Sequence, residues 1–444
     1  MAERGTSNHF STTLIMESVS LQTRNLEKWR TSTFFVMLIG YIGYYLCRGN
    51  LSASFPLLNE TFGYTNTELG RLAFYSELAY AAGKFINGPL GDRIGGRRIF
   101  LVGMVGTIFF NLVFSQGKSL VYFTIAWCCC RYFLSMGWGG LTKTLGAWYE
   151  PDKNGRVMGF VSISFQFGSA LAKVFAGYLV ARGVGWQGLF TYPAAVLALI
   201  WIWSIFASRA TPQDVVPETN FGGITEYKGI SKQKNSADTS VTEILSSLFS
   251  KRLFRLLLVY SFFTTLLRSI FVFWLPKFFV DLGLGTSSAI FKSTLFPLLG
   301  CLGTIGLGWY TDRYLQAGNK DRAQPMALML IALVLCLLGI AVAVRAENVN
   351  TTLVLWLSGL CGFFLLGPYS MSSGCLTLDI AGSRGAGSCT GMLDGIGYIG
   401  GALSVWGAGK LSDVLGWSEV FVVLAIFALI STAAAFVMSR EFRR

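Results

Sequence analysis

The chain has 444 residues, of which 53% are hydrophobic and only 13% are charged. An ordinary soluble domain carries roughly 25% charged residues, so this composition excludes a soluble protein of the same length. The net charge of +13 would suggest a nucleic-acid partner in a soluble chain. In a membrane protein the positions of the charges matter more than their sum.

Apolar runs of about 20 residues, each long enough to cross the hydrocarbon core as a helix, recur about twelve times along the chain. Strand-like alternation is absent, so helices are the spanning structure. The chain is therefore predicted to be an all-α membrane protein. The predicted spans are 33–58, 67–91, 97–116, 119–148, 156–181, 187–208, 253–282, 287–311, 324–345, 351–376, 385–409 and 417–438.

The one long polar stretch divides these spans into two sets. The predicted organisation is a cytoplasmic N-terminal tail (1–32), a six-helix bundle (33–208), a cytoplasmic linker (209–252) with a short amphipathic helix near 242–250, a second six-helix bundle (253–438) and a cytoplasmic tail (439–444).

The nine cysteines all fall within apolar segments, and the single histidine, His9, lies in the N-terminal tail. Such cysteines are interpreted as small core residues rather than metal ligands or disulfides. We therefore predict no metal site and no cofactor, and we expect a protein that is not an enzyme.

Lysine and arginine are concentrated in the loops on one side of the predicted spans. By the positive-inside rule this bias places both termini in the cytoplasm. The opposite face carries only a few basic residues, namely Lys118, Arg182, Lys277, Arg345 and Lys410. Which membrane holds the protein is left open by the sequence.

The two sets of spans repeat each other. The segment Gly88–Arg93 is echoed by Gly308–Arg313, and Arg48 is separated from Arg268 by the same distance along the chain. Features that recur in register indicate duplication, with a pseudo-two-fold axis along the membrane normal. The two arginines are therefore predicted to face each other across that axis.

Several ionisable residues fall inside the predicted spans, where burial is costly and each is a functional candidate. The basic ones are Arg48, Lys84, Arg131, Lys143, Lys173, Arg268 and Lys292, and the acidic ones are Glu77 and Asp394. The basic excess predicts a water-filled cavity that favours anions. Two guanidiniums in it can each give a fork of N–H donors to a phosphate.

Helical spacing places these residues on shared faces. The predicted stripes are Tyr41, Tyr45 and Arg48; Glu77, Tyr80 and Lys84; Ser162, Gln166, Ser169 and Lys173; and Asp394 with Tyr398. Alternatives remain for several of them. Each arginine could be neutralised by a carboxylate, and Lys84 could pair with Glu77. Lys143, Lys173 and Lys292 could extend to an interface, and Arg131 is interpreted as structural or as part of a gate.

The segment GPLGDRIGGRR (88–98) resembles the signature loop of the major facilitator superfamily. The resemblance implies two pseudo-symmetric six-helix bundles and a charge latch that holds one conformation. The latch residues would be Asp92, Arg93, Arg97, Asp312 and Arg313. The alternative is that these arginines only anchor the cytoplasmic face.

Five further segments resemble the organophosphate:phosphate antiporter family, which includes glycerol-3-phosphate and sugar-phosphate exchangers. They are GYIGYYLCRGNLSASFP (40–56), AYAAGKFINGPLGDR (79–93), SMGWGGLTKTLGAWY (135–149), LLRSIFVFWLP (266–276) and GYIGGAL (397–403). The resemblance implies a rocker-switch exchange of an organophosphate for inorganic phosphate. It places the phosphate-binding arginines at Arg48 and Arg268, the lysine at Lys84, and the cavity tyrosines at Tyr41, Tyr45 and Tyr80.

The chain departs from the family pattern at three places, one of which is Gly137-Trp138-Gly139-Gly140, where the glycerol-3-phosphate carriers have GWPP. Gly49 stands where bacterial members carry a lysine, and Gln166 stands where the glycerol-3-phosphate carriers place a histidine. Since a glutamine does not titrate near neutral pH, a histidine-linked charge change is not available. The phosphate end of the site is predicted to be kept, and the identity of the organic part stays open.

The predicted substrate-binding set is Arg48, Arg268, Lys84, Tyr41, Tyr45, Tyr80, Gln166, Lys143, Lys173 and Tyr398, with Glu77 and Asp394 as coupling or charge-pair candidates. The predicted partners are a small phosphorylated anion, inorganic phosphate and the lipid bilayer, without nucleic acid, and the chain is expected to be a monomer. One alternative is a proton- or sodium-coupled organic anion carrier that uses Glu77 or Asp394. Another is a sugar-phosphate receptor that does not transport.

Overall fold

The computed structural model describes residues 4–149, 151–216, 241–316, 321–373 and 375–443. Among these residues every regular element is a helix, which confirms the all-α prediction. Eight helical segments of the described chain are long and apolar enough to cross a membrane. The long helices α1, α2, α6 and α14, outside that group, carry most of the polar residues discussed below.

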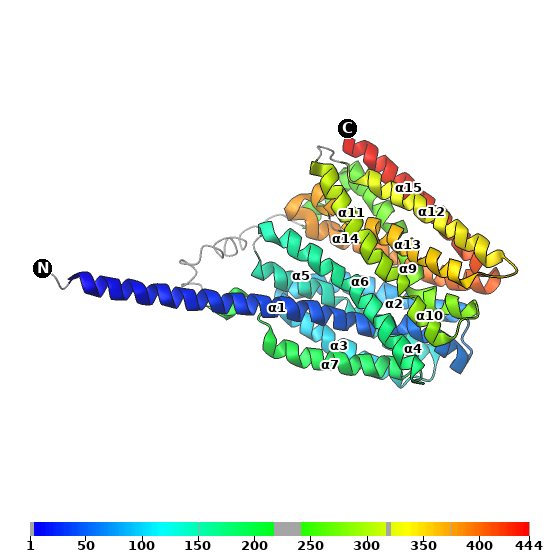
Figure 1. Ribbon diagram of the computed structural model, residues 1–444, viewed down its shortest axis with the longest axis horizontal. Helices are drawn as coiled ribbons and strands as arrows, with labels where there is room; N and C mark the ends of the chain where they lie inside the picture. Colours follow the sequence, from blue (N-terminus) through cyan, green and yellow to red (C-terminus); the bar gives the residue numbers. More distant parts are fainter. Residues whose placement is uncertain (1–3, 150, 217–240, 317–320, 374, 444) are drawn as a thin grey trace.

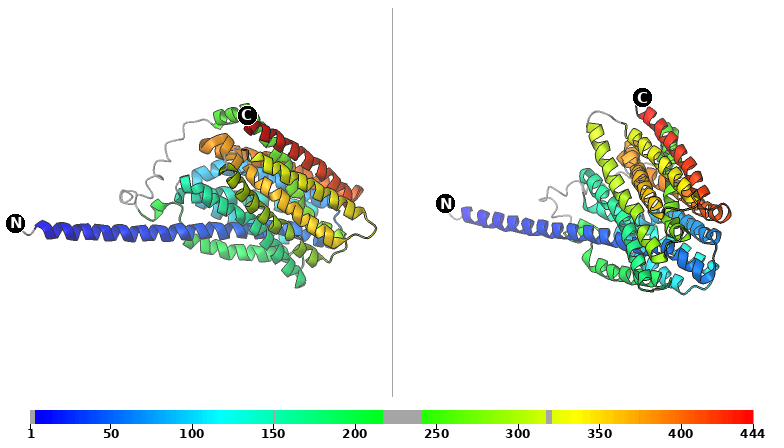
Figure 2. Two further views of the ribbon diagram at one scale, coloured as in Figure 1. Left: turned by 45° about the horizontal axis from the view of Figure 1, so that its top comes forward. Right: turned by 45° about the vertical axis from the view of Figure 1, so that its right-hand side comes forward.

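The helices form two groups that lie side by side (Figures 1 and 2). The first group is α1 (Arg4–Phe62), α2 (Asn66–Ile94), α3 (Gly96–Ser115), α4 (Leu120–Leu134), α5 (Met136–Trp148), α6 (Pro151–Ala181) and α7 (Gly188–Ala207), followed by the short 3-10 helix η1 (Pro212–Asp214). The second group is α8 (Val241–Ser250), α9 (Arg252–Asp281), α10 (Thr286–Lys292), α11 (Leu295–Gln316), α12 (Ala323–Arg345), α13 (Thr351–Ser373), α14 (Cys375–Val414) and α15 (Trp417–Arg443).

Two predicted spans are divided in the structure. The span 119–148 becomes α4 and α5, which meet at Ser135 just before the glycine-rich stretch 137–140. The span 287–311 becomes α10 and α11, separated by Ser293 and Thr294. The Ser293 hydroxyl donates to the carbonyl of Ile290 at 2.6 Å, and such a bond competes with the helical ladder. The short helix predicted near 242–250 is present as α8.

The predicted N-terminal tail is not a loop, because α1 begins at Arg4 and continues unbroken into the membrane span. A small satellite cluster explains why part of this extension is held. Leu26, Trp148 and Val216 are buried together, and the guanidinium of Arg209 lies 3.9 Å from the Trp29 ring centroid. This cluster fastens the extension and the chain after α7 to the end of α5.

Helices α11 and α13 pack with almost no space between their backbones. A β-carbon added to Gly303 would overlap the carbonyl oxygen of Phe363, and one added to Gly362 would overlap that of Phe296. Small residues allow this close approach in membrane helices. The second group is therefore rigidly assembled where it faces α6.

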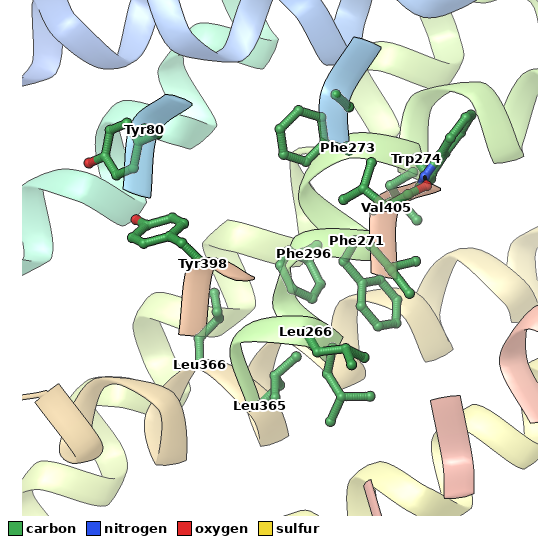
Figure 3. Packing of buried hydrophobic residues seen from close by; sticks show 14 of the residues in the cluster. Tyr80, Leu266, Phe271, Phe273, Trp274, Phe296, Leu365, Leu366, Tyr398 and Val405 are labelled. Carbon is green, nitrogen blue, oxygen red and sulfur yellow. Dashed lines mark hydrogen bonds between the residues drawn. The ribbon is translucent and has the colours of Figure 1, made fainter. Parts of the chain in front are cut away.

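Hydrogen bonds join the two groups toward the end at which α1 and α9 finish. Ser52 donates to the carbonyls of Val272 and Phe273, at 2.8 Å each. Asp413 accepts from the backbone N–H and the hydroxyl of Thr67, at 2.7 and 2.6 Å. We call this side the closed end. Near it Trp274 lies beside Val405 (Figure 3), to whose carbonyl it donates at 2.9 Å.

Candidate functional site

The guanidinium of Arg48 on α1 lies between tyrosines from both groups of helices. It donates to the hydroxyls of Tyr80 and Tyr398 at 3.3 and 3.4 Å. Its carbon also lies 5.4 Å from the Tyr45 ring centroid and 4.7 Å from that of Tyr80. Tyr80 and Tyr398 face each other with centroids 4.7 Å apart (Figure 3). The predicted stripes of α1, α2 and α14 therefore meet at Arg48.

Tyr41, one turn before Tyr45, packs behind the side chains that contact Arg48. Its ring lies 5.4 Å from the rings of Tyr45 and of Trp138 on α5. It is 6% exposed, and its described contacts are with other aromatic rings. Tyr41 supports the position of Tyr45 and is one layer removed from Arg48.

Arg268 on α9 comes from the opposite group of helices. It is 7% exposed, and its guanidinium carbon lies 4.8 Å from the ring centroid of Tyr369 on α13. Gly397 and Gly401, on either side of Tyr398, pack against Thr265 and Ser269 on α9, which lie on either side of Arg268. Arg268 is therefore held at the level of Tyr398, to which Arg48 donates. Tyr369 is not among the predicted site residues. Its signal was an aromatic residue directly after Pro368, inside an apolar span.

Neither arginine is neutralised by a described carboxylate within 4.0 Å. The two acidic residues at this depth have other partners. Asp394 on α14 lies 3.7 Å from the ammonium of Lys84 on α2, and Glu77 contacts Arg131. The alternative in which a carboxylate neutralises each arginine is therefore wrong for this conformation. Lys84 pairs with Asp394 and not with Glu77.

The ammonium of Lys84 also lies 5.4 Å from the Tyr80 ring centroid, which places it beside the tyrosines that contact Arg48. Its side chain is 15% exposed and that of Asp394 is 21% exposed. The pair joins the two groups of helices directly. We call Arg48, Lys84 and Arg268, together with Tyr45, Tyr80, Tyr369, Tyr398 and Asp394, the arginine cluster.

Glu77 and Arg131 form an ion pair inside the first group of helices, with both side chains only 1% exposed. The Arg131 guanidinium lies 4.3 Å from the Tyr80 ring centroid, on the ring that also contacts Arg48. The buried pair favours a structural role for Arg131, and a role in a gate stays a prediction. A coupling role for Glu77 or Asp394 stays a prediction, and each has a basic partner here.

Helix α6 contributes two polar contacts across the interface. The Gln166 amide nitrogen donates to the Thr304 hydroxyl at 2.8 Å, and its amide oxygen is buried without a partner. Lys173, two turns further along, donates to the Ser293 carbonyl at 3.3 Å. Both residues face α10 and α11, as their shared stripe predicted.

Some predicted residues lie elsewhere. Lys143 is exposed, and its β-carbon lies against Gly96 at the beginning of α3 rather than in the arginine cluster. Its assignment to substrate binding stays a prediction. Lys292 is also exposed.

The predicted latch is only partly described. Arg97 donates to the Ser208 hydroxyl and the Ile205 carbonyl at 2.8 and 2.7 Å. These bonds satisfy hydrogen-bond acceptors at the C-terminal end of α7, where a cation interacts favourably with the helix. Arg93 is exposed, and Arg313 stacks on Trp309 at 3.9 Å. The side chains of Asp92 and Asp312 lie outside those described, so the latch stays a prediction.

This arrangement favours binding of an anion. Three cations converge and one carboxylate opposes them, while tyrosine hydroxyls supply further donors. The described residues contain no group of three or more His, Cys, Asp or Glu that could hold a metal ion.

The sequence and the fold both have known relatives. The family profile described as Major Facilitator Superfamily matches residues 37–405. A probable hexose phosphate transport protein of Chlamydia pneumoniae is 26% identical, covering 94% of this chain and 92% of that one. The glycerol-3-phosphate transporter of Bacillus subtilis is 26% identical, with 90% and 89% covered. The membrane sensor protein UhpC of Escherichia coli is 25% identical, with 91% and 90% covered.

Among solved structures, a bacterial homologue of the human lysosomal transporter Spinster superimposes with a TM-score of 0.74 at 15% identity, covering 93% of this chain and 98% of that one. A D-xylose-proton symporter superimposes with a TM-score of 0.73 at 14% identity, covering 92% and 97%. These two likenesses concern the fold alone.

Proposed function

Since the chain belongs to the Major Facilitator Superfamily, we propose that it is a secondary transporter that exchanges a phosphorylated organic metabolite for inorganic phosphate. The substrate is a sugar phosphate, glycerol phosphate or similar ester. Relatives named as hexose phosphate and glycerol-3-phosphate transporters, which match this chain over nearly their whole length, support that substrate class.

The observation that carries the proposal is the pair Arg48 and Arg268. They come from helices α1 and α9, in different groups. Arg48 donates to Tyr398, and α9 packs beside Tyr398 through Thr265 and Ser269, which flank Arg268. An anion bound between them contacts both groups of helices at once. Binding is therefore linked to the movement of one group against the other, as alternating access requires.

The orientation follows from the loop charges. With both termini in the cytoplasm, the closed end faces away from the cytoplasm, and we infer that the site is reached from the cytoplasmic side in this conformation. An inward-open exchanger receives internal phosphate, rocks, and releases it at the opposite face. We expect the chain to act as a monomer.

Counterflow in proteoliposomes tests this function. Vesicles are loaded with phosphate, and labelled phosphate, glycerol-3-phosphate, glucose-6-phosphate, phosphoenolpyruvate or 3-phosphoglycerate is supplied outside. Internal phosphate should stimulate uptake of at least one ester. If phosphate stimulates none of them, the exchange function is wrong. Uptake driven by an imposed pH or sodium gradient, without internal phosphate, would indicate the cation-coupled alternative.

A second candidate function is supported by one relative. UhpC of Escherichia coli is named a membrane sensor protein, so a receptor could share this architecture. A receptor binds the ester in detergent without transporting it. Saturable binding by isothermal calorimetry, together with no counterflow, would favour the receptor over the exchanger.

The Lys84–Asp394 pair provides a specific prediction. Asp394→Asn removes the only described carboxylate within 4.0 Å of Lys84, so phosphate meets less repulsion at the site. A charge at such a distance in a partly exposed site is worth on the order of 1 kcal/mol, so we expect phosphate binding about fivefold tighter. Lys84→Gln should weaken binding to a similar extent.

Equilibrium binding of phosphate to the purified variants measures both effects. Glu419→Gln is the matched control, because it removes a carboxylate paired with Arg345 at an exposed site on α15. Weaker phosphate binding in Asp394→Asn would show that this carboxylate helps to organise the site.

A further inference from the structure

Lys173 on α6 is a buried cation that the proposed exchange does not yet use. The residue is 3% exposed, and its ammonium donates to the carbonyl of Ser293 at 3.3 Å. No described carboxylate lies within 4.0 Å of it. A buried ammonium held by a single carbonyl is incompletely solvated. Contact with water or an anion would therefore stabilise this ammonium.

The surroundings of Lys173 contain one further described polar group without a partner, the Thr294 hydroxyl. Ser293 ends α10, and the next residue, Thr294, is 5% exposed with a hydroxyl that has no hydrogen-bond partner. The hydroxyl belongs to the break between α10 and α11. Lys173 therefore faces a short polar segment, Ser293 and Thr294, between two largely apolar helices.

Lys173 lies on the contact surface between α6 of the first group and α10 and α11 of the second group. On one side of it along α6, the carbonyl of Gly177 accepts from the Ser287 hydroxyl at 3.1 Å. On the other side, Gln166 donates to Thr304. All three contacts join α6 to α10 or α11. Opening the closed end breaks this row and exposes Lys173 to water from that end.

The position of Lys173 relative to Arg48 is fixed by a close helix contact. A β-carbon added to Gly49 would lie 2.9 Å from that of Ala172, so α1 and α6 touch at the residues next to Arg48 and Lys173. Because Gly49 has no side chain, the two helices can approach there. This contact brings the part of α6 that carries Lys173 against the part of α1 that carries Arg48.

We propose that Lys173 is the anion-capturing residue of the opposite conformation: when α6 separates from α10 and α11, its ammonium binds the incoming phosphate group, which then passes to Arg48 and Arg268. This inference rests on the proposed exchange function and adds a site that exists in one conformation only. In the present conformation the same ammonium is buried against Ser293 and is unavailable to substrate.

The two sides of the membrane should therefore respond differently to loss of this charge. In Lys173→Gln, the half-saturating phosphate concentration at the closed-end face should rise about fivefold or more, because one of the attracting charges is lost there. At the opposite face it should change less than about twofold. Lys173→Arg keeps the charge and should stay near the unmodified protein at both faces.

The measurement is phosphate–phosphate exchange in proteoliposomes of uniform orientation, assigned with a cleavable tag at the N-terminus. Half-saturation is measured at each face in turn. Lys292→Gln is the matched control, since it removes a lysine from the exposed side of α10 and should change neither value. Size-exclusion chromatography verifies that each variant is folded.

Three results would overturn the proposal. Equal half-saturation of Lys173→Gln and the unmodified protein at the closed-end face would exclude capture. Opposite changes at the two faces would show that the lysine only shifts the balance between conformations. Absence of exchange by the unmodified protein would overturn the proposed function as well, and so is distinguished from failure of Lys173 alone.

Discussion

Phosphate exchange should fall about a hundredfold or more in Arg48→Ala and in Arg268→Ala, because truncating a buried hydrogen-bonded charge that binds an ion costs about 2–5 kcal/mol. Each substitution removes one of the two guanidiniums that converge from different helices, and the other cannot reach both sides of the anion. Initial rates of counterflow in proteoliposomes measure the loss.

The replacement Arg48→Lys should not restore exchange. Arg48 donates to Tyr80 and Tyr398 through separate nitrogens, and a lysine cannot reproduce this planar fork. Arg182→Ala is the matched control. That arginine is exposed and also stacks on a tyrosine, Tyr178, at 5.2 Å, but it lies at the end of α6. Substantial transport by either cluster variant would remove the two-arginine site.

Loss of one partner from the Glu77–Arg131 pair should produce the largest effect on stability. Both side chains are 1% exposed, so Glu77→Ala leaves an uncompensated guanidinium in the interior. Breaking such a pair costs about 3–5 kcal/mol. We expect the apparent melting temperature in detergent to fall by several degrees, measured by loss of the monodisperse peak after heating.

The double variant Glu77→Met, Arg131→Met distinguishes the charge from the contact. Replacing both ions with apolar side chains of similar size removes the desolvation cost, so stability should return toward that of the unmodified protein. The exposed pair Arg345 and Glu419 is the control, because breaking it should cost at most about 1 kcal/mol. A double variant as unstable as Glu77→Ala would contradict this explanation.

Most helix boundaries could be predicted, because apolar length is a strong and local signal. The end of α7 at Ala207 and the beginning of α12 at Ala323 lie within one residue of the predicted limits. The convergence of Arg48 and Arg268 could also be predicted, since the repeat relates them by symmetry. Both successes depend on patterns that the chain carries along its whole length.

Partner choice among the charges could not be predicted. Glu77 and Arg131 lie on different helices, as do Lys84 and Asp394, and helix rotation decides which side chains meet. The position of Lys143, whose β-carbon lies against Gly96, depends on helix rotation in the same way. Tyr369 could not be predicted as a site residue, because a single aromatic residue in an apolar span belongs to no stripe of polar residues at helical spacing.

Each group of helices has one helix end that is held firmly in place. In the first group it is the α1 extension at the satellite cluster around Trp148, and in the second it is the end of α15. Leu26 and Trp29 hold the α1 extension to the first group. Asp321 accepts from Ser439 and Arg443 at 2.5 and 3.0 Å, which holds the last turns of α15 to the second group. The distance between fluorophores placed on these two helix ends should change with each rocking step, and single-molecule fluorescence measures that change.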